Sequence, residues 1–564
     1  MNDNRPKFLF IVLLDGDLVM SPEHVGVGYL LSVLRQNNIE CKVIELSRDN
    51  HEKCLQDIGE FNPAIIGFSL MSINLHHASE FGHKIRKHYP HIHITCGGPC
   101  ATYGVDALLE SDTGQFLDSA VTGEGEEAII ELYEHLEQGL ELEGVMNVAY
   151  RKDGQVVVNK IRKPIHNLDS LPMPARDQFE AAGSNLEYLR ISTSRGCTSH
   201  CTFCSAPHVG NMLVPSKVWR GRSAVSMADE ITELVNKYNF RTFDFVDSTF
   251  EDPGVIGKRR LKEFAEILIE RNLEIYYNCC FQALNWSDND SELLSLLFQS
   301  GLEKVLVGIE SGTEEGLKRW QKRSTIEDNK RVIRLLREND IYLAFGFIMF
   351  HPHSSLEEVR ENTKFLREHV GENLRRFGTR LEVYPGTAIE RELSAEGLLG
   401  ENYQRTLDCM DYKYIDEEIG MFANSFAGLF GEQYMKTAVI DKEPAVFEFE
   451  SYLIIVHTFI SRLKRKFGHN PEVAVEIELF KEKIHGIYRE MGEYNFHLID
   501  RGLDLLERGG FTPDYFLKQA DPVEKYFYEK MQLIRKLQLK FSRNIMKMGC
   551  NLREIDSKLL TRVN

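Results

Sequence analysis

Three cysteines stand close together in the sequence RGCTSHCTFC, as a CxxxCxxC array of Cys197, Cys201 and Cys204. Thiolates are soft ligands that suit iron–sulfur clusters and zinc. A zinc site would need a fourth ligand, with His200 and His208 as candidates, but zinc sites usually pair two separated elements and no second one lies nearby. Three thiolates hold three irons and leave the fourth iron open to a chelating ligand. The array therefore predicts a [4Fe–4S] cluster with one open iron.

The chain has 11 cysteines, and those outside the array show no paired spacing. A disulfide framework is not expected in a protein of this size without an export signal. Cys279 and Cys280 are adjacent in a predicted strand, where successive side chains face opposite sides, so one of them faces the interior. We interpret that side chain as a buried structural thiol rather than a redox group.

A series of strands and helices begins at about residue 188, and its first strand leads directly into the cysteine array. Apolar runs predict strands at 189–196, 242–248, 275–282, 304–310, 341–350 and 377–385. Amphipathic stretches predict helices at 226–238, 258–270, 290–301 and 326–339. Six β/α units predict a partial (β/α)6 barrel, in which the active site lies at the C-terminal ends of the strands. From about residue 400 the pattern is helical and polar, with no strand series.

Residues 1–140 form an earlier α/β series. Nearly continuous apolar runs at 8–14, 42–46, 64–70, 93–98 and 119–123 predict the strands of a doubly wound, flavodoxin-like parallel sheet. Helices are predicted at 22–36, 75–89 and 126–138. A hairpin with Asp153-Gly154 at its turn and a proline-marked linker follow. We therefore predict four parts, at 1–140, 141–187 (hairpin and linker), 188–395 (barrel) and 396–564 (helical).

Between about residues 188 and 395 the motifs resemble those of the radical SAM superfamily, whose members bind S-adenosylmethionine (SAM) at the open iron. Besides the array, the segments FVDSTF, VGIESG, GFIMFHP and VYPGT stand at the ends of successive predicted strands. The resemblance implies SAM contacts from Phe203, Asp247, Glu310, Ser311 and Ile348. Asp247 departs from the Gly-Gly-Glu that the family frequently has there, and a helix N-cap is an equal alternative for Ser311.

The N-terminal part resembles the cobalamin-binding domains that precede some radical SAM barrels. A doubly wound sheet binds its ligand beyond the strand C-termini, which places the loops after Leu14 and Leu70 around the site. The resemblance rests on motifs after the third, fourth and fifth predicted strands. Paired glycines in such motifs let the backbone approach a nucleotide tail closely. The alternative explanation for these glycines is that they form tight turns at the starts of helices. The implied cobalamin contacts are Ser69, Met71, Gly97, Gly98, Gly123 and Glu124.

One signature of histidine-ligated cobalamin domains, Asp-x-His-x-x-Gly, is absent from the first loop. The nearby His24 has Pro22 two residues before it and Val27 three residues after it. We therefore expect no protein histidine on cobalt, with His76 and His77 as weaker alternative ligands.

The bulk composition narrows the range of partners. A formal net charge of −18 argues against DNA or RNA, because neutralising phosphates needs a basic surface. No run approaches the ~20 apolar residues of a membrane helix, and no signal core follows the N-terminus, so we expect a cytoplasmic protein without membrane contact.

Together the two resemblances imply a cobalamin-dependent radical SAM enzyme. Such an enzyme cleaves SAM to a deoxyadenosyl radical and most often methylates an unactivated carbon or phosphorus centre. The implied partners are a small-molecule, natural-product or peptide substrate and an electron donor such as flavodoxin or ferredoxin. The alternative is a rearranging, ring-forming or oxidising enzyme that uses cobalamin as an electron relay. A cobalamin or redox sensor is disfavoured because sensing does not require the SAM-contacting strand ends, and a tRNA methylthiotransferase is disfavoured by the acidic charge balance.

Overall fold

The computed structural model describes residues 5–14, 23–182, 188–206, 219–251, 254–372, 378–403, 409–429 and 445–555. The chain forms two compact units. The first comprises Met1–Cys280 with Glu382–Asp411, and the second comprises Phe281–Leu381 with Tyr412–Asn564. This division falls inside the predicted barrel, whereas the predicted boundaries at 140, 187 and 395 stay predictions.

The N-terminal sheet has the strand order β2-β1-β3-β4-β5-β6-β7 in the described part of the chain. Its strands are β1 (Phe8–Leu13), β2 (Cys41–Leu46), β3 (Ile65–Ser69), β4 (His93–Gly97), β5 (Ser119–Val121), β6 (Val148–Lys152) and β7 (Gln155–Val158). The first five pair in parallel in the predicted doubly wound order. The predicted hairpin turns at Asp153 and Gly154, both at positive φ, and joins the sheet edge through an antiparallel β5–β6 pair.

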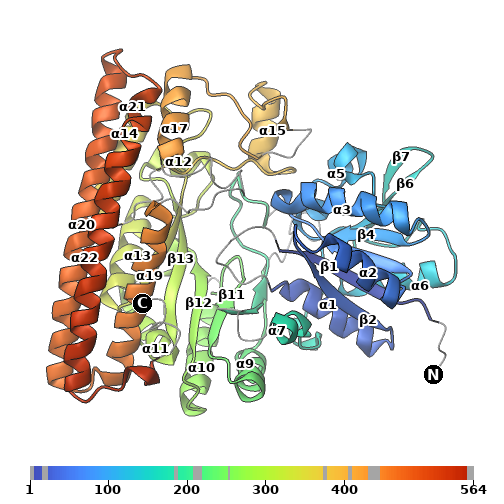
Figure 1. The fold of residues 1–564 in the computed structure, drawn as a ribbon, viewed down its shortest axis with the longest axis horizontal. Coiled ribbons are helices and arrows are strands. Elements are labelled where there is room, and N and C mark those ends of the chain that lie inside the picture. The colour runs from blue at the N-terminus through green and yellow to red at the C-terminus, as the bar shows by residue number, and fades with distance from the viewer. Residues whose placement is uncertain are drawn as a thin grey trace. The chain divides into compact units, whose positions relative to one another are not determined.

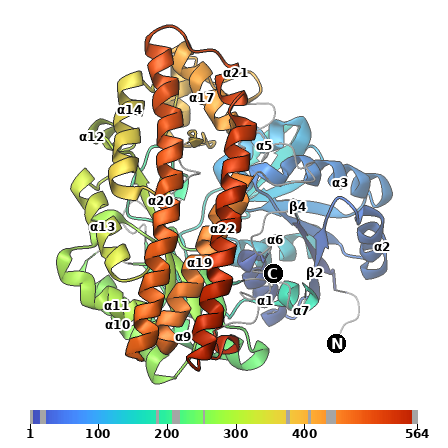
Figure 2. The same cartoon turned by 60° about the vertical axis from the view of Figure 1, so that its left-hand side comes forward.

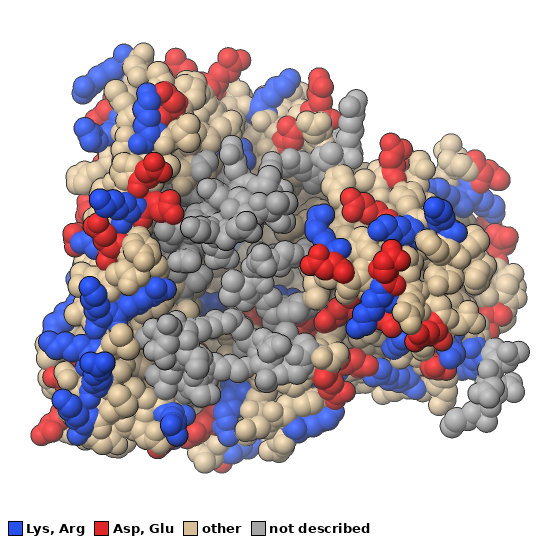
Figure 3. Space-filling model, viewed as in Figure 1, with Lys and Arg blue, Asp and Glu red and all other residues tan. Residues whose placement is uncertain are grey.

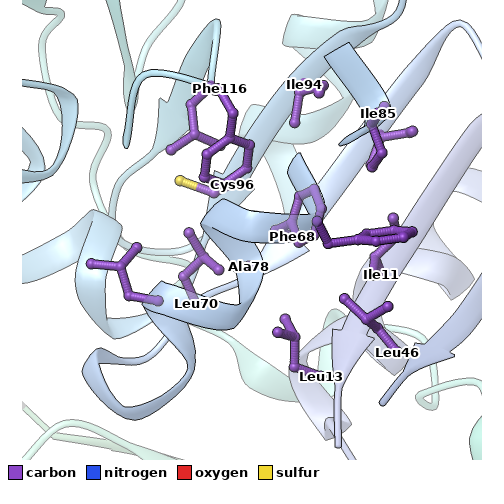
Figure 4. Packing of buried hydrophobic residues seen from close by; sticks show 14 of the residues in the cluster. Ile11, Leu13, Leu46, Phe68, Leu70, Ala78, Ile85, Ile94, Cys96 and Phe116 are labelled. Carbon is purple, nitrogen blue, oxygen red and sulfur yellow. The ribbon is translucent and has the colours of Figure 1, made fainter. Parts of the chain in front are cut away.

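Helices cover both faces of this sheet, which is why all of β1 is buried. One face carries α2 (His51–Phe61), α3 (Leu75–His88), α4 (Pro99–Tyr103) and α5 (Val105–Glu110), and the other carries α1 (Val25–Gln36) and α6 (Glu126–Glu137) (Figure 1). Figure 4 shows the core on the first face, where Phe68 meets Phe116 edge-on with ring centroids 5.5 Å apart. The predicted α/β fold of this part is confirmed.

The rest of the first unit holds β8 (Leu189–Ile191), β11 (Thr242–Phe245) and β12 (Tyr276–Phe281), paired in parallel through β11. Helices α9 (Ala224–Tyr238), α10 (Val255–Glu270) and α15 (Ala388–Ala395) also belong to it. The predicted strand 189–196 is broken, because Ser194–Arg195 (β9) leaves β8 and pairs antiparallel with Arg220–Gly221 (β10). The cysteine array lies between β9 and β10 in the sequence.

In the second unit, β13 (Leu302–Glu310) pairs in parallel with β14 (Tyr342–Phe347). The accompanying helices are α11 (Ser291–Ser300), α12 (Glu314–Arg319), α13 (Ile326–Glu338) and α14 (Leu356–Phe365). The sixth predicted strand, 377–385, is not a strand among the described residues, where only an isolated bridge joins Phe350 to Arg380. The reason is that β14 ends at Phe347, so no regular ladder reaches this segment.

The predicted helical C-terminal region is confirmed. It contains α17 (Glu417–Leu429), α19 (Ala445–Phe467), α20 (Pro471–Glu507), α21 (Asp514–Leu517) and α22 (Ala520–Lys547). Helices α19, α20 and α22 lie side by side (Figure 2), and Phe480 of α20 stacks on Phe541 of α22 at 4.1 Å. Asn470 caps α20 by accepting hydrogen bonds from two backbone amides of its first turn. Within the described residues, no helix has the length and apolarity needed to cross a membrane.

Candidate functional site: the cysteine loop and the N-terminal cavity

The three array cysteines lie in the loop that starts directly after β9. Gly196 takes a φ of +89°, which favours glycine, and turns the chain into the loop. Cys197 is buried, whereas Cys201 and Cys204 are half-buried and joined by a backbone hydrogen bond of 3.2 Å. The Ser199 amide lies 3.5 Å from Cys197 Sγ, and the described cysteines form no disulfide. Three soft sulfur ligands in one short loop fit the predicted cluster; His208 lies outside the described residues.

The antiparallel β9–β10 pair forms the stem of this loop. Four charged side chains join the stem to the N-terminal domain. Arg195 of β9 donates to Glu126 Oε1 at 2.5 Å, and Arg220 of β10 donates to Glu124 Oε1 at 2.6 Å. Arg195 also lies 3.6 Å from Glu124, whose other oxygen accepts the Ile165 amide at 2.9 Å. We call Arg195, Arg220, Glu124 and Glu126 the stem clamp. Because Glu124 lies in the loop after β5 and Glu126 begins α6, both strands of the stem are anchored where β5 leads into α6.

The arginines of the stem clamp shift the pKa of Glu124. Burial raises the pKa of Glu124, but the Arg220 hydrogen bond and the charges of Arg195 and Arg220 outweigh burial and hold the pKa below its usual range. Glu124 is therefore a permanently charged anchor at neutral pH. The second oxygen of Glu126 is buried and has no hydrogen-bond partner among the described residues, although Glu126 lines a cavity.

Asp247, the predicted SAM contact after β11, supports the segment that leads to the cysteines. Its side chain is only 5% exposed. One oxygen accepts the amides of Thr193 and Ser194 at 2.8 Å each, and the other accepts the Thr193 hydroxyl. Burial raises the pKa of Asp247 to about 6 despite these hydrogen bonds. Its contact with SAM stays a prediction, and its visible partners give it a positioning role.

A cavity of about 480 Å³ lies at the C-terminal ends of the N-terminal strands. Its volume is in the range of cofactor sites. The cavity gathers all six residues that the sequence predicted for cobalamin, and several that it did not. The predicted ones are Ser69, Met71, Gly97, Gly98, Gly123 and Glu124; the others include His24, Gly26, Tyr29, Glu126, Arg190, Ser192, Arg195 and Val246.

Glycines keep this cavity open. A Cβ added to Gly26 would meet no atom within 4 Å, and one added to Gly97 would meet only Val121 O at 3.8 Å. Side chains at these two positions would therefore grow into the cavity. Gly98 has a φ of +93°, and a Cβ there would lie 2.9 Å from Leu70 O. Gly26 and Gly97 thus leave room for a bulky ligand close to the backbone, whereas glycine at 98 is required by packing against Leu70.

Of the histidines weighed as cobalt ligands, only His24 lines the cavity. Its Nδ1 lies 3.3 Å from Ser69 Oγ, so the ring is held by a side chain of β3. His77 is buried with its Nε2 2.8 Å from His51 Nε2, and His76 is exposed. Neither His76 nor His77 is among the residues that line the cavity. The expectation of no protein histidine on cobalt stays a prediction.

In the second unit, Glu310 ends β13 with a φ of +64°, a conformation that is uncommon outside glycine. The strand pairing shifts here, and the Ile348 amide donates to Glu310 O at 2.9 Å. Backbone strain of this kind concentrates at functional sites. Ser311 is fully buried and accepts the Thr313 amide at 3.1 Å, but the N-cap of α12 is Thr313, so the N-cap alternative for Ser311 is wrong. SAM contacts of Glu310, Ser311 and Ile348 stay predictions.

One further outcome concerns a residue outside these sites. Burial raises the pKa of the Cys279 thiol well above its usual value, which agrees with a structural thiol.

Sequence reasoning missed Arg195, Arg220 and Glu126. The available signal was an arginine at the entrance to the cysteine array and a second glutamate in the Gly-Glu-Gly-Glu run.

Comparison with known proteins agrees with this geometry. Residues 17–133 match the B12 binding domain, and residues 191–366 match the Radical SAM superfamily. An uncharacterized methyltransferase of Pyrococcus horikoshii is 24% identical over 441 residues, which cover 76% of this chain and 91% of the relative. The anaerobic magnesium-protoporphyrin IX monomethyl ester cyclase of Rubrivivax gelatinosus is 26% identical over 359 residues, 61% of each chain.

Among solved structures, the fold resembles OxsB, a cobalamin-dependent S-adenosylmethionine radical enzyme solved with aqua-cobalamin and S-adenosylmethionine bound. The TM-score is 0.68 with 18% sequence identity, over 99% of this chain and 84% of that one. At this identity the likeness concerns the fold. The matched B12 binding domain contains most of the residues that line the cavity, and the matched radical SAM region contains the cysteine loop. The chain therefore has a B12 binding domain followed by a radical SAM domain.

Proposed function

We propose that this protein is a cobalamin-dependent radical SAM methyltransferase that methylates an unactivated carbon or phosphorus centre of a small molecule. The observation that carries the proposal is the stem clamp. It joins the loop that holds the three cysteines to a cavity lined by all six predicted cobalamin contacts. An enzyme that moves a group from one cofactor to a radical made by another must hold both in a fixed relation.

The chain's own residues would have three tasks. Cys197, Cys201 and Cys204 would hold a [4Fe–4S] cluster, and the glycine-lined cavity would hold cobalamin. When bound, the cluster supplies an electron for SAM cleavage and cobalamin supplies the methyl group. Asp247 fixes the segment before the cysteines through the Thr193 and Ser194 amides. The stem clamp fixes the β9–β10 pair from which the cysteine segment starts.

A second candidate function is ring formation or oxidation without methyl transfer. The cyclase relative favours it, because its name describes a ring-forming enzyme. We favour methyl transfer because the relative named a methyltransferase matches over 91% of its own length, against 61% for the cyclase. This preference is an argument by analogy.

The deciding experiment uses SAM with a deuterated methyl group, the reconstituted protein and candidate natural-product precursors. Methyl transfer consumes SAM for two purposes, so deoxyadenosine and S-adenosylhomocysteine should form in near-equal amounts and the product should gain the labelled methyl. Deoxyadenosine that accumulates with an unlabelled product would replace this function with the ring-forming one.

The proposal includes partners and location. We expect an electron donor such as flavodoxin or ferredoxin, a cytoplasmic location and no nucleic acid. On the face shown in Figure 3, lysines and arginines are interspersed with aspartates and glutamates over the described residues. That mixture supports the exclusion of nucleic acid, which needs a continuous basic surface.

A further inference from the structure

The second unit contains a separate cavity of about 460 Å³. It lies between the start of β14, the π-helix Leu366–Val370 and two of the C-terminal helices, α19 and α20. Its volume suits a small ligand. Its lining includes Arg337, Tyr342, His457, Lys481, His485 and four glutamates.

This cavity is remote from the predicted SAM contact of the same strand. Tyr342 begins β14 and lines the cavity, whereas Ile348 follows the other end of the strand. Five residue-to-residue steps of extended chain separate the two ends of β14 by about 16 Å. A ligand here would therefore be distinct from SAM.

The charges around the cavity leave one cation without a carboxylate. Arg337 donates to the carbonyls of His369 at 2.7 Å and Val370 at 2.5 Å, and no described carboxylate forms an ion pair with it. Glu372 already accepts from His485 Nδ1 at 2.8 Å, and Glu478 accepts from Lys464 at 2.7 Å. The two remaining carboxylates, those of Glu368 and Glu482, belong to exposed residues.

His457 adds an independent sign of a missing partner. Its Nδ1 is buried and has no hydrogen-bond partner among the described residues. The centroid of its ring lies 5.2 Å from that of the Tyr342 ring and 6.5 Å from that of the His485 ring. Burial lowers the pKa of His457 to about 3, so the imidazole is neutral and keeps one N–H to donate. Unsatisfied buried nitrogens call for a water, an ion or a ligand.

The π-helix gives this wall of the cavity an unusual backbone. Such helices are rare and occur frequently at functional sites. The carbonyls of its last two residues, His369 and Val370, hold the Arg337 guanidinium in place. A guanidinium fixed in this way presents its remaining face as a planar fork that matches a carboxylate or a phosphate.

We propose that this cavity binds a small carboxylate- or phosphate-bearing molecule, with Arg337 holding its oxyanion and the α20 side chains Lys481 and His485 lying beside it. The site is independent of the methyltransferase proposal, because none of its residues belongs to the cysteine loop or to the N-terminal cavity. A ligand at this end of β14 would act as an effector rather than as a reactant.

The test is isothermal titration calorimetry, which measures the binding of inorganic phosphate and, separately, of malonate to the full-length protein. The titrations use chloride buffers of constant ionic strength. We expect saturable binding of at least one probe; phosphate alone would identify a phosphorylated ligand and malonate alone a carboxylate. Arg337→Gln should weaken binding at least tenfold, which is about 1.4 kcal/mol. Arg334→Gln is the matched control, because Arg334 lies one turn earlier on α13 and already pairs with Glu338 at 3.0 Å.

His457→Phe keeps an aromatic ring against Tyr342 but removes both nitrogens, so it should also weaken binding. It provides a second measurement if Arg337→Gln lowers the melting temperature. Absence of saturable binding of both probes would overturn the proposal. So would wild-type affinity in a folded Arg337→Gln protein, or equal losses in Arg337→Gln and Arg334→Gln, which would indicate general charge screening.

Discussion

The stem clamp gives the sharpest test of how the cysteine loop is positioned. Arg195 and Glu126 have side chains that are 19% and 7% exposed and lie 2.5 Å apart. Arg195→Gln would leave the Glu126 carboxylate buried without its cation, which should cost about 3 kcal/mol of unfolding free energy. Glu126→Gln should cost about 1.5 kcal/mol, because Arg195 keeps Glu124 at 3.6 Å and the Tyr29 ring at 5.4 Å.

The double variant should cost about as much as Arg195→Gln alone, because both changes remove the same interaction. The cycle then gives a coupling of about 1.5 kcal/mol, measured by urea unfolding of the protein without cofactors. Glu127→Gln is the control: Glu127 also lies in the first turn of α6 and pairs with Arg162 at 2.8 Å, but it is 55% exposed. Its loss should stay below about 1 kcal/mol.

A second readout separates positioning from simple stability. In reconstituted protein that remains folded, Arg195→Gln should change the electron paramagnetic resonance spectrum of the reduced cluster, whereas Glu127→Gln should not. The reasoning is refuted if the costs of the two single changes sum to the cost of the double variant within about 0.5 kcal/mol. It is also refuted if Arg195→Gln and Glu127→Gln behave alike in both assays.

The remaining predictions concern the cofactors and one buried carboxyl. Changing all three array cysteines to alanine should abolish the brown colour and iron of anaerobically reconstituted protein; native protein with stoichiometric zinc and no iron would contradict the cluster. Gly26→Leu should weaken cobalamin binding at least tenfold in a spectroscopic titration, because the side chain enters the cavity, and unchanged affinity would argue against cobalamin there. The Co(II) spectrum of bound cobalamin should lack nitrogen splitting, and a splitting lost in His24→Ala would reverse that prediction. Burial raises the pKa of Asp247 from an ordinary 3.8 to about 6 in the folded protein. The unfolding free energy of the wild type should therefore fall as the pH rises from about 4 to about 6, and Asp247→Asn should remove this fall. Parallel curves of unfolding free energy against pH for the two proteins would refute the raised pKa of Asp247.

Several features of this protein followed from the sequence alone, because their causes are local. Apolar runs predicted the five parallel strands of the N-terminal sheet and β11 to β14 of the second series, and Asp153-Gly154 predicted the hairpin turn. The cysteine spacing predicts the cluster ligands without any knowledge of the fold, and that ligand set stays a prediction. The six predicted cobalamin residues share one cavity because the ends of parallel strands meet at one edge of a sheet.

Other features depended on contacts between distant parts of the chain. Glu124 was predicted as a ligand contact, yet its ion-pair partners are Arg195 and Arg220, 71 and 96 positions away. Asp247 binds the backbone of Thr193, 54 positions earlier. The sixth predicted strand lacked a ladder because β14 ends at Phe347, which the pattern of 377–385 cannot reveal. Sequence periodicity reports which side of an element is buried, but the partner of a buried charge is chosen by the tertiary packing that brings the two elements together.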